Sequence, residues 1–156
     1  MNTPADESPG LRRARLCALA DVDRGKHLRW QKRGLLERRS SYGLTDVLGA
    51  ALLDELNSAL GPKAARAVWR RVRREIGVPG SRLEIVIVLA TLEARLARSD
   101  EALAEALPRG EQVVVVDLSA RARLAQERFR GFLADEAAEA DGGAKGGATD
   151  ERRRSV

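Results

Sequence analysis

The side chains best suited to binding chemistry crowd into one short stretch of the sequence. Residues 24–42 hold seven Lys or Arg residues, the only histidine of the chain and a single acid, Glu37. Cations at this density suit a polyanion such as a phosphate backbone, because each can neutralise a phosphate or donate to the edge of a base. We expect the contacts to come from Arg24, Lys26, His27, Arg29, Lys32, Arg33, Arg38, Arg39, Ser41 and Tyr42.

Groups typical of catalysis or metal binding are scarce. Cys17 is the only cysteine and His27 the only histidine, so the sequence offers no ligand set for zinc. Glycine-rich phosphate loops, His-Glu-x-x-His and nucleophile elbows do not occur. Asp117 ends a valine run, where metal-binding carboxylates stand in some α/β proteins, but it is more simply explained as helping to start a helix at Ser119. We therefore expect no enzyme activity, no cofactor and no metal.

Charge is divided between the two halves of the chain. Residues 11–39 hold ten Lys or Arg residues against three acids, and residues 63–77 hold six against one. Residues 83–140 reverse the balance, with seven basic residues against eleven acids. A segregated positive region suits a phosphate backbone, whereas solubility needs only mixed signs. Solvated, arginine-rich helix faces would explain the same composition without any ligand.

Hydrophobic periodicity predicts four helices in the basic half. Asp23 and Thr45 are the expected N-caps, Gly34 ends the second helix, and Gly61 ends the third. Trp30 is expected to lie in the core, since buried tryptophan contributes a large apolar surface. The predicted helices are Leu11–Ala20, Arg24–Arg33, Asp46–Leu60 and Pro62–Ile76, with a polar segment, Glu37–Gly43, before the third.

The acidic half has a different character, and Gly77–Gly80 marks the expected boundary. Leu83–Leu89 and Gln112–Leu118 are continuous apolar runs, typical of strands covered on both faces. Thr91–Arg98 suits either a second strand of a hairpin or the start of a helix, and the strand is favoured. Two helices are expected here as well, Asp100–Leu107 and Ala120–Ala137, capped by Ser99 and Ser119.

The segment Leu16–Leu36, with the sequence LCALADVDRGKHLRWQKRGLL, resembles the start of MerR-family regulators. That family has an apolar first helix, a valine at the turn, a recognition helix ending in an aromatic residue, a charged pair and Gly-Leu-Leu or similar. Trp30 stands at the aromatic position, and Gln31–Leu36 follows it with the charged pair and Gly-Leu-Leu of the family's pattern. Arg38–Tyr42 matches the basic wing, and Thr45–Val47 matches the start of the next helix.

Two features depart from the family's pattern. Leu28 stands two residues before Trp30, where the family usually has arginine, and Arg29 carries the positive charge instead. The wing is also short and lacks a full Gly-Tyr-Arg-x-Tyr pattern. These departures affect individual base or phosphate contacts more than the fold.

The resemblance covers residues 11–75 and implies a winged helix-turn-helix whose second helix enters the major groove of DNA. The predicted fold class is therefore α+β, with an N-terminal all-α winged helix-turn-helix over residues 11–77. A small α/β domain follows over residues 81–140 and serves dimerisation or partner binding. A leader, residues 1–10, and a tail, residues 141–156, are expected to be disordered.

These features predict a sequence-specific transcription regulator that binds double-stranded DNA as a homodimer. The polar first ten residues do not resemble a signal peptide, and no apolar run is long enough to cross a bilayer, so we expect a cytoplasmic, nucleoid-associated protein with no membrane partner. One alternative is a phage-type excisionase or architectural protein, or an adaptor whose acidic α/β domain docks another protein. Another is a switch whose tail domain binds a small effector.

Overall fold

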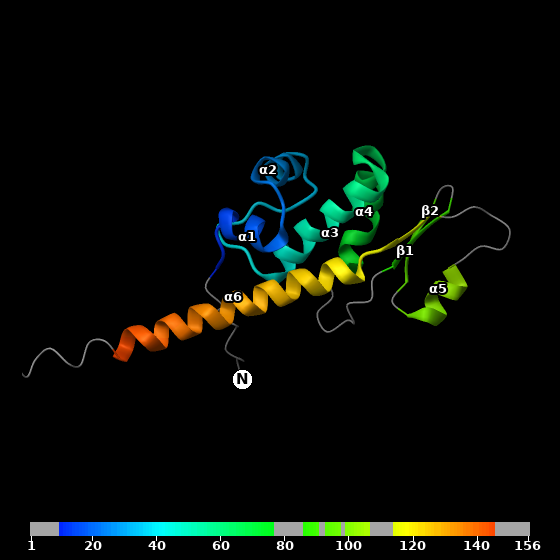
Figure 1. The fold of residues 1–156 in the computed structure, drawn as a ribbon. Coiled ribbons are helices and arrows are strands. Elements are labelled where there is room, and N and C mark those ends of the chain that lie inside the picture. Colours follow the sequence, from blue (N-terminus) through cyan, green and yellow to red (C-terminus); the bar gives the residue numbers. More distant parts are fainter. Residues whose placement is uncertain (1–9, 77–85, 91–92, 98, 107–113, 146–156) are drawn as a thin grey trace, which may run out of the picture.

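The computed structural model describes residues 10–76, 86–90, 93–97, 99–106 and 114–145. Four helices open the chain, a small sheet with one short helix follows, and a long helix closes it (Figure 1). In chain order the elements are α1 (Arg13–Ala20), α2 (Arg24–Lys32), α3 (Leu44–Leu60), α4 (Pro62–Ile76), β1 (Val86–Ala90), β2 (Glu93–Ala97), α5 (Asp100–Ala106), β3 (Val114–Asp117) and α6 (Ser119–Lys145).

The start of α3 differs from the prediction. Thr45 was expected as the N-cap, but the helix begins at Leu44 and Gly43 precedes it. The Asp46 carboxylate accepts a hydrogen bond of 2.9 Å from the Gly43 N–H, which satisfies one of the donors that a helix leaves free at its N-terminus. Gly61 ends α3 with a φ of 80°, a conformation that favours glycine.

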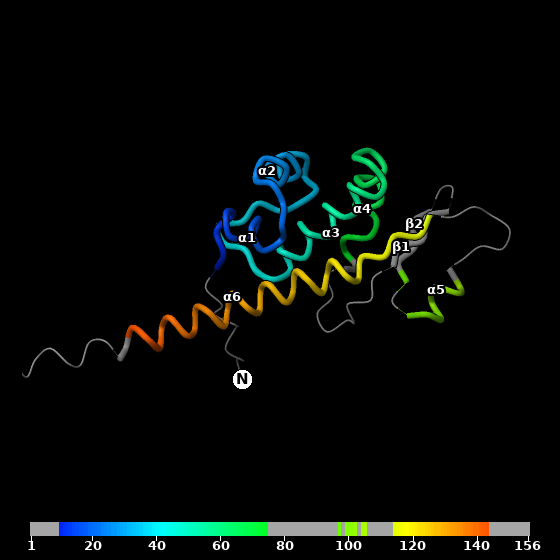
Figure 2. The backbone as a smooth tube through the Cα atoms, viewed as in Figure 1, coloured from blue at the N-terminus to red at the C-terminus, as the bar shows by residue number. Residues whose placement is uncertain are grey.

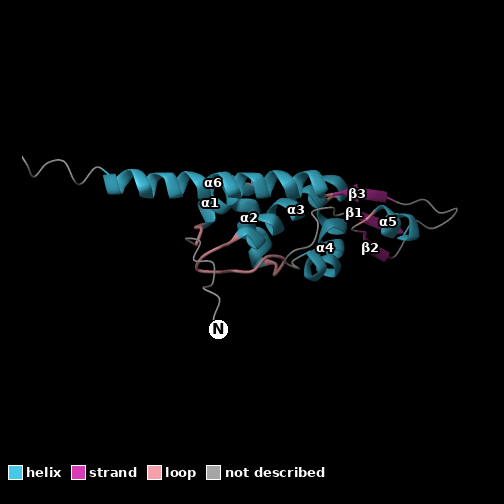
Figure 3. Ribbon diagram, turned by 90° about the horizontal axis from the view of Figure 1, so that it is seen from below, coloured by secondary structure: helices cyan, strands magenta, loops and turns pink. Residues whose placement is uncertain are grey.

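Among the described residues, one hydrophobic core cluster combines side chains from both halves of the chain. α3 lies at its centre, and α1, α4 and α6 all pack against it. α6 runs along one side of α1 and α3, beneath them in the backbone trace (Figure 2) and above them in the ribbon seen from below (Figure 3). The core therefore combines Leu16, Leu52 and Leu56 from the basic half with apolar side chains of the acidic half. These are Val116, Leu118, Ala122, Ala125 and Phe129.

The sheet of the acidic half is small and antiparallel throughout. β1 lies in the middle, pairs with β2 through Val86–Ala97, and pairs with β3 through Val86–Asp117. The exposed fractions of Val114 and Val115 are 53% and 46%, so β3 is not covered on both faces as its apolar run predicted. A continuous apolar run indicates a strand but does not guarantee that other elements will cover it.

The predicted fold class is wrong, because the described residues are mostly α-helical and do not show the small α/β C-terminal domain that was expected. α6 alone has 27 residues, whereas the strands have five, five and four. Instead of closing a unit with the strands, α6 covers the face of α3 and α1 left open by the other helices. Periodicity shows which face of a helix is apolar but not which element covers it. The expected boundary at Gly77–Gly80 lies outside the described residues.

Candidate nucleic-acid interface

α1 and α2 form two short helices joined by a three-residue turn. Asp21 ends α1 in the left-handed conformation, with a φ of 55°, and the Val22 N–H donates back to the Cys17 carbonyl at 2.9 Å. The Asp23 carboxylate accepts a 2.9 Å hydrogen bond from the Lys26 N–H and so caps α2, as the sequence predicted. Val22 is buried, which fixes the turn on the core. Two short helices joined by a turn of this length are one feature of helix-turn-helix motifs.

One face of α2 and its C-terminal end presents cations to solvent. Arg24, Arg29, Lys32 and Arg33 are exposed, and none of them forms an ion pair within the described part of the chain. The opposite face carries Trp30, which is 5% exposed, as the sequence predicted. The helix therefore has an exposed cationic face and a buried face, on which Trp30, His27 and Gln31 anchor it to the rest of the protein.

Lys26 lies on α2 but is already engaged within the protein. Its Nζ is 2.8 Å from the Asp54 Oδ1 of α3, and its side chain is 35% exposed. The ammonium group also lies over the Trp30 ring, 5.9 Å from the ring centroid. A phosphate would have to compete with Asp54 for this cation. Lys26 was predicted as a contact residue, and its position assigns it to holding α2 on α3.

His27 and Tyr42, which were predicted to contact DNA, are buried inside the protein. Their exposed fractions are 1% and 6%, and their rings meet edge to face with centroids 5.9 Å apart. The Tyr42 hydroxyl accepts a hydrogen bond from Gln31 inside the protein. His27 lies three residues before Trp30, so the turn of 100° per residue places both on the same, buried face of α2. We therefore remove both residues from the predicted contact set.

Gln31 connects α2 to the loop that follows it, a role the sequence analysis missed. Its Nε2 donates to the Glu37 carbonyl at 2.9 Å and to the Tyr42 Oη at 2.8 Å. Its Oε1 accepts from the Arg13 Nη2 at 2.8 Å. Buried amides require such partners. The available signal was a glutamine next to Trp30, a residue expected to lie in the core.

The loop between α2 and α3 is the counterpart of the predicted wing. Its end is fixed by a two-residue antiparallel bridge, in which the N–H groups of Leu11 and Tyr42 each donate to the other's carbonyl at 2.9 and 3.0 Å. Arg38 and Ser41 are exposed. Arg39 is exposed as well, but its guanidinium lies 2.6 Å from the Glu37 carboxylate and 3.5 Å from that of Asp46. Unlike Arg39, Arg38 forms no ion pair with the described residues.

α4 extends the basic surface beyond the end of α2. The Trp69 indole N–H donates to the Leu35 carbonyl at 2.8 Å, and Arg73 donates to the Gly34 carbonyl at 2.9 Å. These bonds hold the C-terminal half of α4 directly against the residues that follow α2. Arg70 and Arg74 are exposed on the same helix. The predicted amphipathic pattern of α4 is confirmed by the burial of Ala65, Val68, Trp69 and Val72.

Burial lowers the pKa of His27 below its usual value of 6.5, and the positive charge of Arg13 lowers it further, while Asp46 opposes the shift. The His27 Nδ1 is buried without a hydrogen-bond partner among the described residues. A proton added to this ring would therefore place a poorly solvated positive charge next to Arg13.

We expect acid to destabilise the protein through His27. The unfolded chain takes up a proton as the pH falls below about 6.5, whereas the folded chain does so only at lower pH, so the free energy of unfolding falls across that interval. Urea unfolding at a series of pH values between 7.5 and 5 measures this slope. His27→Gln should flatten it, because the chain has no other histidine. An equal slope in wild type and variant would contradict the assignment.

Other site chemistry is limited in the described residues. Within them, no group of three or more His, Cys, Asp or Glu side chains is placed to hold a metal ion. Hydrogen bonds from the Ser119 side chain and from the Ser119 N–H, the latter at 2.8 Å, lower the pKa of the Asp117 carboxyl group and confirm its role in starting α6. Among the described helices, none has the length and apolar character to cross a membrane.

No protein-family model matches the chain, and no curated protein matches it significantly.

Proposed function

We propose that the protein is a sequence-specific DNA-binding transcription regulator and that α2 is its recognition helix. The observation that carries this proposal is the exposed cationic face of α2, held on a helix-turn-helix by a buried opposite face. Long cationic side chains on such a helix can reach the edges of bases in the major groove. The proposed contact set is Arg24, Arg29, Lys32, Arg33, Arg38 and Ser41, with flanking phosphate contacts from Arg70 and Arg74.

The proposal includes a homodimer, located in the cytoplasm with the nucleoid. β3 is an outer strand of the sheet, and its Val114 and Val115 side chains are exposed. Such an edge is stabilised when another strand pairs with it, and a second copy offers the same edge. The resemblance of residues 11–75 to the MerR family is in keeping with two-fold DNA sites, which dimeric helix-turn-helix proteins bind.

Selection from random duplex DNA tests the function directly. We expect the purified full chain to enrich a defined motif made of two half-sites in inverted order. Half-site centres should be separated by about one helical turn, roughly 34–36 Å, or a multiple of it. Retention of DNA without an enriched motif would instead favour an architectural protein that binds the backbone alone. No retention at 50 mM salt would remove nucleic acid from the proposal.

Arg29→Ala and Lys32→Ala should weaken DNA binding without changing the fold. Each phosphate contact that is lost should lower the slope of log affinity against log salt by about one, and a lost base contact should cost roughly 1–3 kcal/mol of discrimination. Fluorescence anisotropy with the selected duplex across a salt series measures both effects. Arg123→Ala is the matched control, because Arg123 is an exposed arginine of α6. If Arg29→Ala and Lys32→Ala have the same affinity and salt slope as Arg123→Ala and wild type, the assignment of α2 is contradicted.

A further inference from the structure

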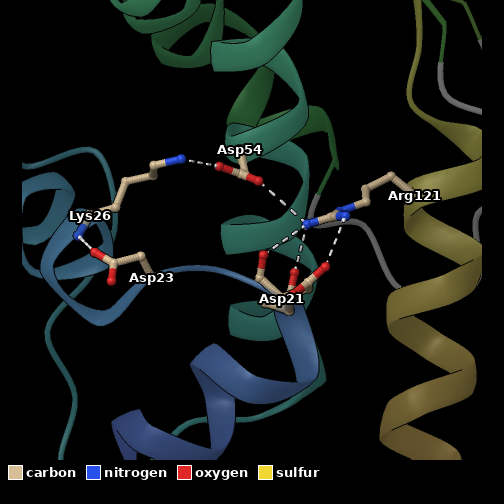
Figure 4. Close-up of polar contacts among 6 residues, drawn as sticks. Asp21, Asp23, Lys26, Asp54 and Arg121 are labelled. Atoms are coloured by element: carbon tan, nitrogen blue, oxygen red, sulfur yellow. Dashed lines mark hydrogen bonds and ion pairs between the residues drawn. The ribbon is translucent and has the colours of Figure 1, made fainter.

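One arginine of α6 contacts the turn of the helix-turn-helix. The Arg121 guanidinium donates to the Ala20 carbonyl at 2.9 Å and to the Asp21 carbonyl at 3.2 Å (Figure 4). Both carbonyls belong to the C-terminal end of α1, where a helix leaves acceptors without intrahelical partners. A second arginine of α6, Arg128, lies 3.9 Å from the Asp21 carboxylate. α6 therefore caps α1 from outside and fixes the residues that lead into α2.

Asp54 of α3 connects this contact to α2 itself. Its Oδ2 is 3.4 Å from the Arg121 Nη2, and its Oδ1 is 2.8 Å from the Lys26 Nζ. Figure 4 shows the carboxylate between the two cations, with α2 on one side and α6 on the other. The side chains of Asp54 and Arg121 are only 17% and 19% exposed. Partly buried charges are costly to leave unpaired, so the loss of one member affects the others.

We propose that Arg121 is a positioning residue for DNA recognition, which sets the orientation of α2 through the α1–α2 turn and through Asp54. The inference rests on the proposed function of the α2 face. It assigns α6 a part in DNA binding although the Arg121 side chain points toward Asp21 and Asp54, within the protein (Figure 4). Groove recognition tolerates little displacement of the recognition helix, because direct readout depends on hydrogen-bond geometry.

Two measurements on Arg121→Met separate positioning from contact. In the absence of DNA, we expect amide hydrogen exchange of α2 to become about tenfold faster relative to α4, because hydrogen bonds to a charged group are lost. Affinity for the selected duplex should fall by about tenfold, with the salt slope unchanged because Arg121 neutralises no phosphate. Arg123→Met removes the same charge from the same helix and should leave α2 exchange and affinity at wild-type values.

Asp54→Asn provides a second, nearly isosteric variant in case Arg121→Met unfolds. The substitution keeps the shape of the Asp54 side chain but removes the negative charge that pairs with Lys26 and Arg121. Faster amide exchange should therefore again be confined to α2 and the α1–α2 turn. Unchanged α2 exchange in a folded variant, or equally faster exchange in all helices, would overturn the positioning role. If the wild-type chain binds no duplex DNA, the proposed function fails, while the exchange measurements still decide whether Arg121 orders α2.

Discussion

A chain that ends at Gly77 should lose its cooperative unfolding transition, although it keeps α1–α4. The truncation removes Leu118 and Phe129 from the core, whose exposed fractions are 0% and 7%, and uncovers the faces of α3 and α1 on which α6 packs. Each buried apolar side chain of this size contributes roughly 1.5–3 kcal/mol, whereas whole domains have about 5–15 kcal/mol of stability. Circular dichroism during thermal unfolding measures the result.

Two point variants of the full chain provide the controls for this truncation. Phe129→Ala should lower the free energy of unfolding by about 3–5 kcal/mol, the usual cost of truncating a buried phenylalanine. Arg130→Ala, at the neighbouring exposed position, should change it by no more than about 0.5 kcal/mol. A truncated chain with the wild-type midpoint would show instead that residues 11–76 fold without α6.

Local patterns predicted the helices of the first half because local signals determine them. Asp23 caps α2, and the break at Gly61 before Pro62 separates α3 from α4, as the sequence indicated. The placement of α6 was not predictable in this way. Leu124, Phe129, Phe132 and Leu133 were expected to pack onto the sheet, whereas α6 packs mainly on α3 and leaves Leu124 40% exposed. Tertiary packing decided between the sheet and α3, and periodicity does not contain that information.

The sequence predicted which segment carries the cations of the candidate interface, but not which of its side chains are exposed. A high local density of cations identified α2, but exposure depends on the rotation of the helix about its axis. That rotation buries His27 and exposes Arg29 two residues later. The engagement of Lys26 by Asp54 was also beyond sequence reasoning, since 28 residues separate the partners. The same holds for the contacts of Arg121 with Ala20 and Asp21, which precede it by 101 and 100 positions.

Trp30→Ala should affect binding only through stability, in contrast to Arg29→Ala beside it. Trp30 is 5% exposed, and its truncation should cost about 3–5 kcal/mol. For a chain of 156 residues this lowers the melting temperature by roughly 10 °C or more. Arg29→Ala should melt like wild type and bind DNA weakly, whereas Trp30→Ala should melt early and recover binding at low temperature, where enough of it is folded. If Trp30→Ala melts like wild type and still fails to bind, the indole belongs to the contact surface and the two-faced description of α2 is wrong.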